Sequence, residues 1–364
     1  MNIGVPKERR PFEFRVGLTP AAVQMLAEEG HLCYVEHNAG IGAGFSDQEY
    51  EQAGARVVYS PHEVFGRADL LLKVARPIYE ELEWLRPQTT IMGLLHLSSA
   101  RMDKIKVLQE KHITAIPYEQ IAFADGSVPV RKPLSQIGGR LVAQISAHLL
   151  QNDAQGKGLL LGGIAGVPPA EVVIIGAGIF GTYATRAFVG IGAHVTVLDV
   201  SYEALMRIHD EMPNVVTMMS NQINIKRVTT FADVVVAGIL VPDERTPVVI
   251  TRDMVRAMKP GSLIMDVSID EGGCVETSRP TSHDHPTYIE EGVIHYCVPN
   301  IPSVVARTST FAFLNAAYPY IQEIAEKGSE QAIADNPAIE RGAAIIKGQI
   351  RHLPRLRPIG SEGE

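Results

Sequence analysis

Short apolar runs alternate along the chain with longer segments whose apolar residues have helical spacing. In the first part of the chain the predicted strands are Ile3–Val5, Cys33–Glu36, Asp69–Val74, Thr90–Leu95 and Ile113–Pro117. Helices are predicted over Thr19–Glu29, with Thr19 as the N-cap and Pro20 in the first turn, and over Ala100–Lys111. Strands and helices in this alternation predict a parallel sheet with helices on both faces.

A second series of the same kind follows a long predicted helix at Leu134–Gln151. Its predicted strands are Glu171–Ile175, His194–Leu198, Asp233–Ala237, Ser262–Val267 and Val293–Cys297. Another long helix, Ser309–Lys327, is expected to return the chain to the first domain. The expected fold is α/β, with two Rossmann-like domains whose parallel sheets are separated by a cleft. Residues 133–302 form a domain inserted into a discontinuous one made of 1–132 and 303–364, with a loosely held tail at Arg351–Glu364.

Composition excludes several classes of protein. The chain has 364 residues, of which 46% are hydrophobic and 20% charged, which is typical of globular domains. A formal charge of -8 argues against nucleic acid as a partner, and no apolar run approaches the roughly 18 residues that span a bilayer. The N-terminus does not resemble a signal peptide, and three widely spaced cysteines predict neither disulfides nor a metal site. We therefore expect a cytoplasmic protein that binds no membrane.

A glycine-rich turn supplies the strongest local motif. The apolar strand before Gly176 leads into Gly-x-Gly-x-x-Gly, formed by Gly176, Gly178 and Gly181, and then into a helix. In a dinucleotide site the first glycine permits the tight turn, the second admits the pyrophosphate and the third allows close helix packing. Such turns also occur as simple links between a strand and a helix. Asp199 follows the next strand at the spacing of an acid that binds the adenosine ribose, and its charge favours NAD over NADP.

Four ionisable residues are candidates for the chemistry: Arg15, Lys73, His96 and Asp270. Three of them follow apolar strands, and ligands of open parallel sheets bind beyond the carboxyl ends of the strands. Each one alone could equally be a solvated strand end. His283-Asp284-His285 could bind a metal, but no third ligand is indicated, so we expect a hydrogen-bonding role there and no metal site.

Several segments resemble the alanine dehydrogenase and nicotinamide-nucleotide transhydrogenase family over residues 1 to about 350. They are Gly4-x-Pro6-x-Glu8 with Glu13-x-Arg15-Val16, Leu70–Val74, Leu95–Leu97, Gly162–Val167, Gly176–Gly178, Ser268–Cys274 with Ser278–Thr281, His283–Tyr288 and Arg307–Thr310. The Ser268–Cys274 segment is similar to the alanine dehydrogenase branch and departs from the transhydrogenase branch. The resemblance implies NAD-dependent oxidative deamination of L-alanine to pyruvate and ammonia, and the reverse reductive amination.

The resemblance also implies roles for individual residues. Arg15 would pair with the substrate carboxylate, Lys73 would bind the carbonyl oxygen and carboxylate, and His96 would be the general acid/base. Asp270 would orient ammonia or water and stabilise the cationic iminium. The implied cofactor contacts are Ser135, Gly176, Gly178, Gly181, Asp199, Ser220, Ile239, Leu240, Val267, Ile269, Asp270, Arg279, Val298, Asn300 and Ile301. A homohexamer is implied as well.

The chain departs from the family pattern at Gln136, Ile301 and Ser303, and again after Gly348. These changes keep two alternatives open: a related oxidoreductase acting on another pair of 2-oxo acid and amine, and the NAD-binding component of a transhydrogenase. A non-catalytic NAD sensor is a further alternative that the four ionisable residues disfavour.

Overall fold

The computed structural model describes residues 1–241 and 245–353 as two compact units. One unit contains Met1–Leu134 together with the chain from Ser303 onward, and the other contains Ser135–Pro302. The predicted tail Arg351–Glu364 lies outside the described residues from position 354 on. None of the described helices is both long and apolar enough to cross a membrane.

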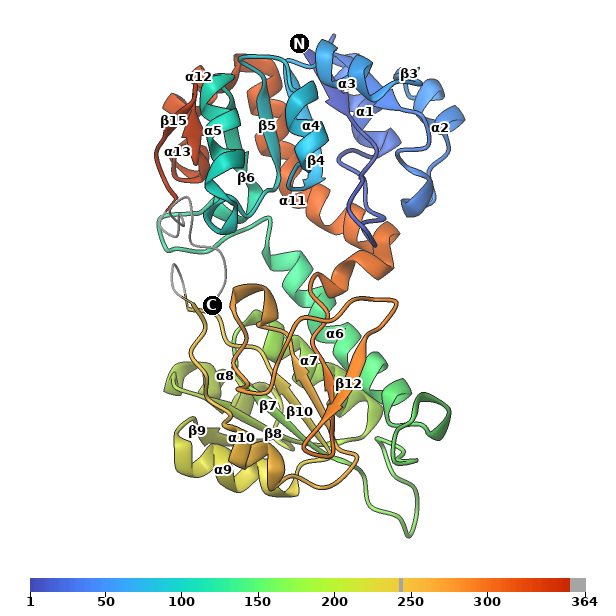
Figure 1. The fold of residues 1–364 in the computed structure, drawn as a ribbon, viewed down its shortest axis with the longest axis vertical. Helices are drawn as coiled ribbons and strands as arrows, with labels where there is room; N and C mark the ends of the chain where they lie inside the picture. The colour runs from blue at the N-terminus through green and yellow to red at the C-terminus, as the bar shows by residue number, and fades with distance from the viewer. Residues whose placement is uncertain (242–244, 354–364) are drawn as a thin grey trace. The chain divides into compact units, whose positions relative to one another are not determined.

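The first unit is built on an eight-stranded sheet in the order β15-β14-β6-β5-β4-β1-β2-β3 (Figure 1). Its strands are β1 (Asn2–Val5), β2 (Leu32–Glu36), β3 (Arg56–Val58), β4 (Leu70–Ala75), β5 (Thr90–Leu94), β6 (Thr114–Pro117), β14 (Ile345–Ile346) and β15 (Gln349–Ile350). The pairs from β3 to β6 are parallel, whereas β14 pairs antiparallel with β6 and with β15. The first six strands have the order 3-2-1-4-5-6 of a Rossmann sheet.

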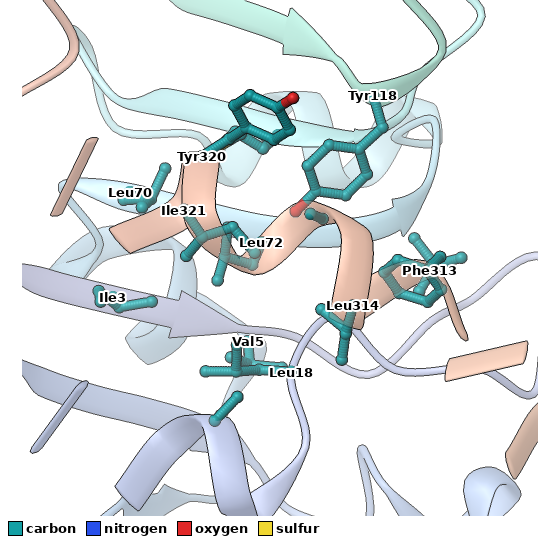
Figure 2. Close-up of a cluster of buried hydrophobic side chains, with 14 of the residues drawn as sticks. Ile3, Val5, Leu18, Leu70, Leu72, Tyr118, Phe313, Leu314, Tyr320 and Ile321 are labelled. Carbon is teal, nitrogen blue, oxygen red and sulfur yellow. The ribbon is translucent and has the colours of Figure 1, made fainter. Parts of the chain in front are cut away.

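Two hydrophobic cores cover the two faces of this sheet. Leu70, Leu72 and Val74 of β4 belong to one core, and Leu71 belongs to the other, as the period of two in a strand requires. Figure 2 shows the first core, where Ile321 of α11 lies beside Leu72 of β4. The helices of this unit are α1 (Pro20–Glu28), α2 (Asp47–Gln52), α3 (Pro61–Arg67), α4 (Tyr79–Trp84), α5 (Met102–Glu110), α11 (Ala306–Lys327), α12 (Ser329–Asp335) and α13 (Pro337–Gly342). The predicted cap is confirmed, because the Thr19 hydroxyl accepts a hydrogen bond from the amide of Ala22.

The second unit has a seven-stranded sheet in the order β12-β13-β11-β10-β7-β8-β9 (Figure 1). Its strands are β7 (Glu171–Ile175), β8 (His194–Asp199), β9 (Val216–Met219), β10 (Val234–Ala237), β11 (Leu263–Asp266), β12 (Thr287–Glu290) and β13 (Val293–Tyr296). Its helices are α7 (Ile179–Ile191), α8 (Tyr202–Glu211), α9 (Gln222–Phe231) and α10 (Arg252–Arg256), and α6 (Lys132–Leu149) runs from the first unit into it. Without β12 the strands again have the Rossmann order, so the predicted α/β class with two Rossmann-like sheets is confirmed.

The sequence pattern predicted two parallel sheets, but neither sheet is parallel throughout. Antiparallel strands close one edge of each sheet: β14 and β15 in the first, β12 in the second. All three are short, and tight connections join β12 to β13 and β14 to β15, which two antiparallel strands allow and two parallel strands do not. The short edge strands β3 and β9 were also missed, because neither presents a continuous apolar run.

Candidate functional site

The candidate residues of the first unit gather at the carboxyl edge of its sheet. Arg15 lies in the connection between β1 and α1, and His96 follows β5. Lys73 lies inside β4, as it does in the predicted strand Asp69–Val74, and β4 continues to Ala75. The neighbouring strands β1 and β4 mark the point where the strand order reverses, and ligands of such sheets bind there.

Lys73 is buried in a cluster of charges. Its ammonium donates to Glu81 Oε1 at 2.8 Å and to Glu8 Oε2 at 3.2 Å, and all three side chains are at most 2% exposed. Burial acts to lower the pKa of Lys73, but Glu8 and Glu81 outweigh it and the pKa is raised. An ammonium has three N–H donors, so two are already used by carboxylates. The remaining N–H of Lys73 could donate to a substrate oxygen.

The two carboxylates come from different elements. Glu8 follows β1 and also accepts the backbone amide of Val74 at 2.7 Å. Burial raises the pKa of Glu8, while Lys73 acts in the opposite direction. Glu81 lies in α4, where its second oxygen accepts the amide of Ile78 at 2.9 Å. Glu8 belongs to the opening motif, whereas nothing in the sequence around Glu81 indicated a contact with Lys73.

Arg15 is also buried and paired. Its Nε and Nη2 donate to the two oxygens of Glu13, at 2.7 and 2.6 Å, and the side chain is 2% exposed. This is the two-point geometry that suits a guanidinium and a carboxylate. Glu13 therefore occupies the Nε/Nη2 edge of the guanidinium, and a substrate carboxylate would bind Arg15 along its other edge, formed by Nη1 and Nη2.

His96 combines an exposed side chain with an unusual backbone. Its φ is 42° and its ψ 46°, in the left-handed region that residues with a side chain seldom adopt. The flanking residues Leu95 and Leu97 are buried. The loop is therefore anchored on both sides of His96, and the imidazole faces solvent.

In the second unit the glycine-rich turn has the shape that a dinucleotide requires. Gly176 has a φ of 107°, and a Cβ on Gly181 would lie 1.7 Å from the carbonyl oxygen of Gly176. A Cβ on Gly178 would meet nothing within 4 Å, so the turn is open there. Gly178 is the N-cap of α7 and supplies no side-chain cap, which leaves the first amides of the helix for phosphate oxygens. The turn therefore fits a pyrophosphate.

Asp199 ends β8 beside this turn. Its Oδ2 accepts the amide of Ala177 at 2.5 Å and its Oδ1 that of Ser201 at 2.7 Å. A carboxylate has about four acceptor positions, so Asp199 can accept ribose hydroxyls while it keeps these two bonds. Ser220, the residue after β9, donates its amide to the Asp199 carbonyl at 2.8 Å.

Asp270 lies in a loop that is stabilised by hydrogen bonds to the buried carboxylate of Asp266. The loop follows β11, and Asp266 at the end of that strand accepts the amides of Ser268, Cys274 and Val275 at 3.2, 2.9 and 3.1 Å. Asp270 itself is exposed, and its Oδ2 accepts the amide of Asn300 at 3.3 Å. The buried carboxylate of Asp266 thus shapes the loop that presents Asp270.

Ser268 ties this loop to the one after β10. Its hydroxyl donates to the Ile239 carbonyl and accepts the Ile239 amide, both at 2.8 Å. The expected cofactor residues lie in the segments that follow β7, β8, β9, β10, β11 and β13, apart from Ser135 in α6. Those segments leave one edge of a parallel sheet, so the structure brings these residues together within the second unit.

The remaining polar clusters indicate no further chemistry. Asp284 accepts hydrogen bonds from the Ser282 hydroxyl and, at 3.1 Å, from the amide of His285. Within residues 1–241 and 245–353, no group of three or more His, Cys, Asp or Glu side chains is placed to hold a metal ion. Burial raises the pKa of Cys274 and that of Cys297, which disfavours reactive thiolates.

Family models match almost the whole chain. Residues 4–138 match the model described as "Alanine dehydrogenase/PNT, N-terminal domain". Residues 142–353 match "Alanine dehydrogenase/PNT, C-terminal domain". An alanine dehydrogenase of Methanococcus maripaludis is 44% identical over 354 residues, which cover 97% of this chain and 95% of that protein.

Solved structures agree with these matches. A structure of an L-alanine dehydrogenase superposes with a TM-score of 0.93 at 40% identity, covering 97% of each chain. A transhydrogenase from Sinorhizobium meliloti has a TM-score of 0.83 at 22% identity, covering 96% of this chain and all of that one. At that identity the second likeness concerns the fold alone.

Proposed function

This chain belongs to the alanine dehydrogenase/PNT family, and from that premise we propose that it catalyses the reversible oxidative deamination of L-alanine. In the forward direction L-alanine, NAD and water give pyruvate, ammonium, NADH and a proton. The transhydrogenase alternative is disfavoured, because curated alanine dehydrogenases share about 40% identity with the chain over nearly its whole length.

One observation carries the proposal: charged residues suited to an amino acid lie at the carboxyl edge of one sheet, and a pyrophosphate turn lies at that of the other. Arg15 and Lys73 are cations held in fixed positions by buried carboxylates. An anionic substrate is attracted to such cations, and an amino acid always presents a carboxylate. His96, with its exposed imidazole, provides a group that can both accept and donate a proton.

Each residue has a distinct role in the proposed reaction. Arg15 binds the substrate carboxylate, and the third N–H of Lys73 donates to the oxygen that water adds to the iminium and that becomes the carbonyl oxygen of pyruvate. In the reverse direction negative charge develops on this oxygen when ammonia attacks the carbonyl. His96 takes the proton from the attacking water and later returns one to the departing nitrogen. Asp270 stabilises the cationic iminium that remains once hydride has left Cα.

The second unit is a Rossmann-type nucleotide-binding domain, and NAD is the nicotinamide cofactor that we propose for it. Bound NAD would accept the hydride from Cα of the substrate. Gly176, Gly178 and Gly181 would hold its pyrophosphate, and the carboxylate of Asp199 would accept the adenosine ribose hydroxyls and repel a 2′-phosphate. We propose that the other expected cofactor contacts, which include Ser135 and Ile301, also bind NAD.

A screen of 2-oxo acids and amines with NADH tests the substrate. Loss of NADH absorbance with pyruvate and ammonium is expected to exceed that with any other pair. Faster turnover with a larger amine, and a secondary amine as product, would instead identify the related oxidoreductase. Turnover that requires an added protein partner would support the transhydrogenase component.

We also propose a cytoplasmic homohexamer, in keeping with the family resemblance. Light scattering of the purified protein at micromolar concentration should give about six times the mass of one 39.6 kDa chain. A mass of one chain would contradict the proposal.

A further inference from the structure

The backbone of His96 needs outside support to keep its conformation. With φ of 42° and ψ of 46°, the residue lies where its Cβ crowds the neighbouring carbonyl oxygen. Residues with a side chain persist in this region only where surrounding contacts hold them there, and such positions cluster at functional sites. The contacts that hold His96 are therefore informative.

Glu119 supports the loop from the amide side. Its Oε1 accepts the amide of His96 at 2.5 Å, and its Oε2 accepts the amide of Leu95 at 3.2 Å. Glu119 lies in η3 (Tyr118–Gln120), the short 3-10 helix that follows β6. One carboxylate thus holds two consecutive amides of a loop that leaves the adjacent strand β5.

Arg76 supports the same residue from the carbonyl side. Its Nη1 donates to the His96 carbonyl oxygen at 2.9 Å, and the Ser99 hydroxyl donates to that oxygen at 3.0 Å. Burial lowers the pKa of Arg76, and Arg10 adds to this effect, whereas Glu119 opposes it. The carboxylate of Glu119 and the guanidinium of Arg76, from two other segments, therefore hold the amide and the carbonyl of His96.

We infer that Glu119 is a positioning residue, which fixes the imidazole of His96 through the backbone while making no contact with the substrate. The inference rests on the proposed role of His96 as general acid/base. Proton transfer needs the imidazole within hydrogen-bonding reach of the reacting atom, and a displacement of about 1 Å can cost roughly 10²-fold in rate. Both oxygens of Glu119 are directed at the backbone of this loop.

Glu119→Gln is the direct test, because glutamine keeps the shape but offers one acceptor oxygen in place of two. We expect kcat to fall about 10- to 100-fold, with the NADH dissociation constant and the thermal midpoint close to wild type. Gln120→Ala is the matched control. It removes a neighbouring side chain that contacts the loop through a 3.4 Å hydrogen bond from its Nε2 to the Ser98 hydroxyl. This variant should leave kcat unchanged. A kcat of Glu119→Gln equal to wild type would overturn the inference.

A double-mutant cycle with His96→Ala separates positioning from a general structural role. If Glu119 acts through the imidazole, Glu119→Gln should cause no further loss of kcat in the His96→Ala background. A further loss of the same size as in wild type would contradict the inference.

A crystal structure of Glu119→Gln gives a readout that does not depend on turnover. We expect His96 to leave the left-handed region; an unchanged φ would overturn the inference. Wild-type protein that is inactive with pyruvate but active with another oxo acid would instead count against the proposed substrate, and the cycle would then be measured with that oxo acid.

Discussion

Replacing Lys73 by methionine would remove the cation from between two buried carboxylates. The ammonium lies 2.8 Å from Glu81 and 3.2 Å from Glu8, and all three side chains are at most 2% exposed. Solvent therefore screens this cluster little, and the variant would leave two buried carboxylates of which Glu81 keeps only the more distant Arg9, at 3.7 Å, as a cationic neighbour. Removing one partner of a buried ion pair costs about 3–5 kcal/mol. For a domain of 150–250 residues this corresponds to a fall of about 6–20 °C in the unfolding midpoint.

The loss should also depend on pH. Burial raises the pKa of Glu8 above its ordinary value of 4.5, and without Lys73 that effect is opposed only by the hydrogen bond from the amide of Val74. A carboxyl group whose folded pKa is raised binds a proton in the folded state that the unfolded chain has already released. Its contribution to stability is therefore present below about pH 4.5 and is lost as pH rises through the folded pKa. Lys73→Met should consequently be less destabilised at pH 5 than at pH 8.

Thermal unfolding at fixed protein concentration measures both effects, since assembly makes the midpoint depend on concentration. Lys327→Met is the matched control: this lysine also lies between two carboxylates, each at 3.0 Å, but it is 39% exposed, so its loss should change the midpoint little. Adding Glu8→Gln to Lys73→Met should recover part of the loss, because the carboxylate of Glu8, which has no ion pair besides that with Lys73 among the described residues, is then gone. A midpoint for Lys73→Met within about 2 °C of wild type, below the shift expected for 1 kcal/mol, would refute the account of a buried charge cluster.

Three further expectations concern the second unit and the reaction. Asp199→Ala, combined with an added arginine nearby, should raise the use of NADP relative to NAD; a wild type that already prefers NADP would contradict the assignment. His96→Ala and Asp270→Asn should lower kcat by about 10²–10⁴ with little change in NADH affinity. Arg15→Ala should instead mainly raise the KM for pyruvate. A near-wild-type kcat in His96→Ala would overturn the mechanism. Asp266→Asn should lower the melting midpoint and kcat together, since an amide cannot accept from all the backbone donors that this buried carboxylate satisfies; unchanged values of both would exclude a role for Asp266 in shaping the Asp270 loop.

Much of the fold could be predicted from local patterns. The central strands of both sheets were expected close to their observed bounds, since each buried strand of a parallel sheet is a short apolar run. The cap at Thr19 and the turn at Gly176 depend on residues adjacent in the chain, and both have the expected geometry. These features are encoded within a few residues, so a single sequence reveals them.

The partners of the candidate residues could not be predicted in this way. Lys73 follows an apolar run, and by itself it indicated a strand end facing solvent. Only the packing of α4 beside β4, with the segment after β1, brings Glu81 and Glu8 to its ammonium and lets a charged residue stay inside the strand. The same is true of Glu119, which reaches His96 from the end of the next strand.

The sequence by itself thus determined two Rossmann-like sheets, a glycine-rich turn before α7, and the identity of the ionisable residues at the strand ends. The tertiary structure alone decided which of these residues are buried, which carboxylates hold them, and how the backbone of His96 is kept in its left-handed conformation. The physical reason is that a buried charge or a strained backbone is stable only with partners, and those partners come from segments that are distant in the chain and meet through the order of strands in the sheet.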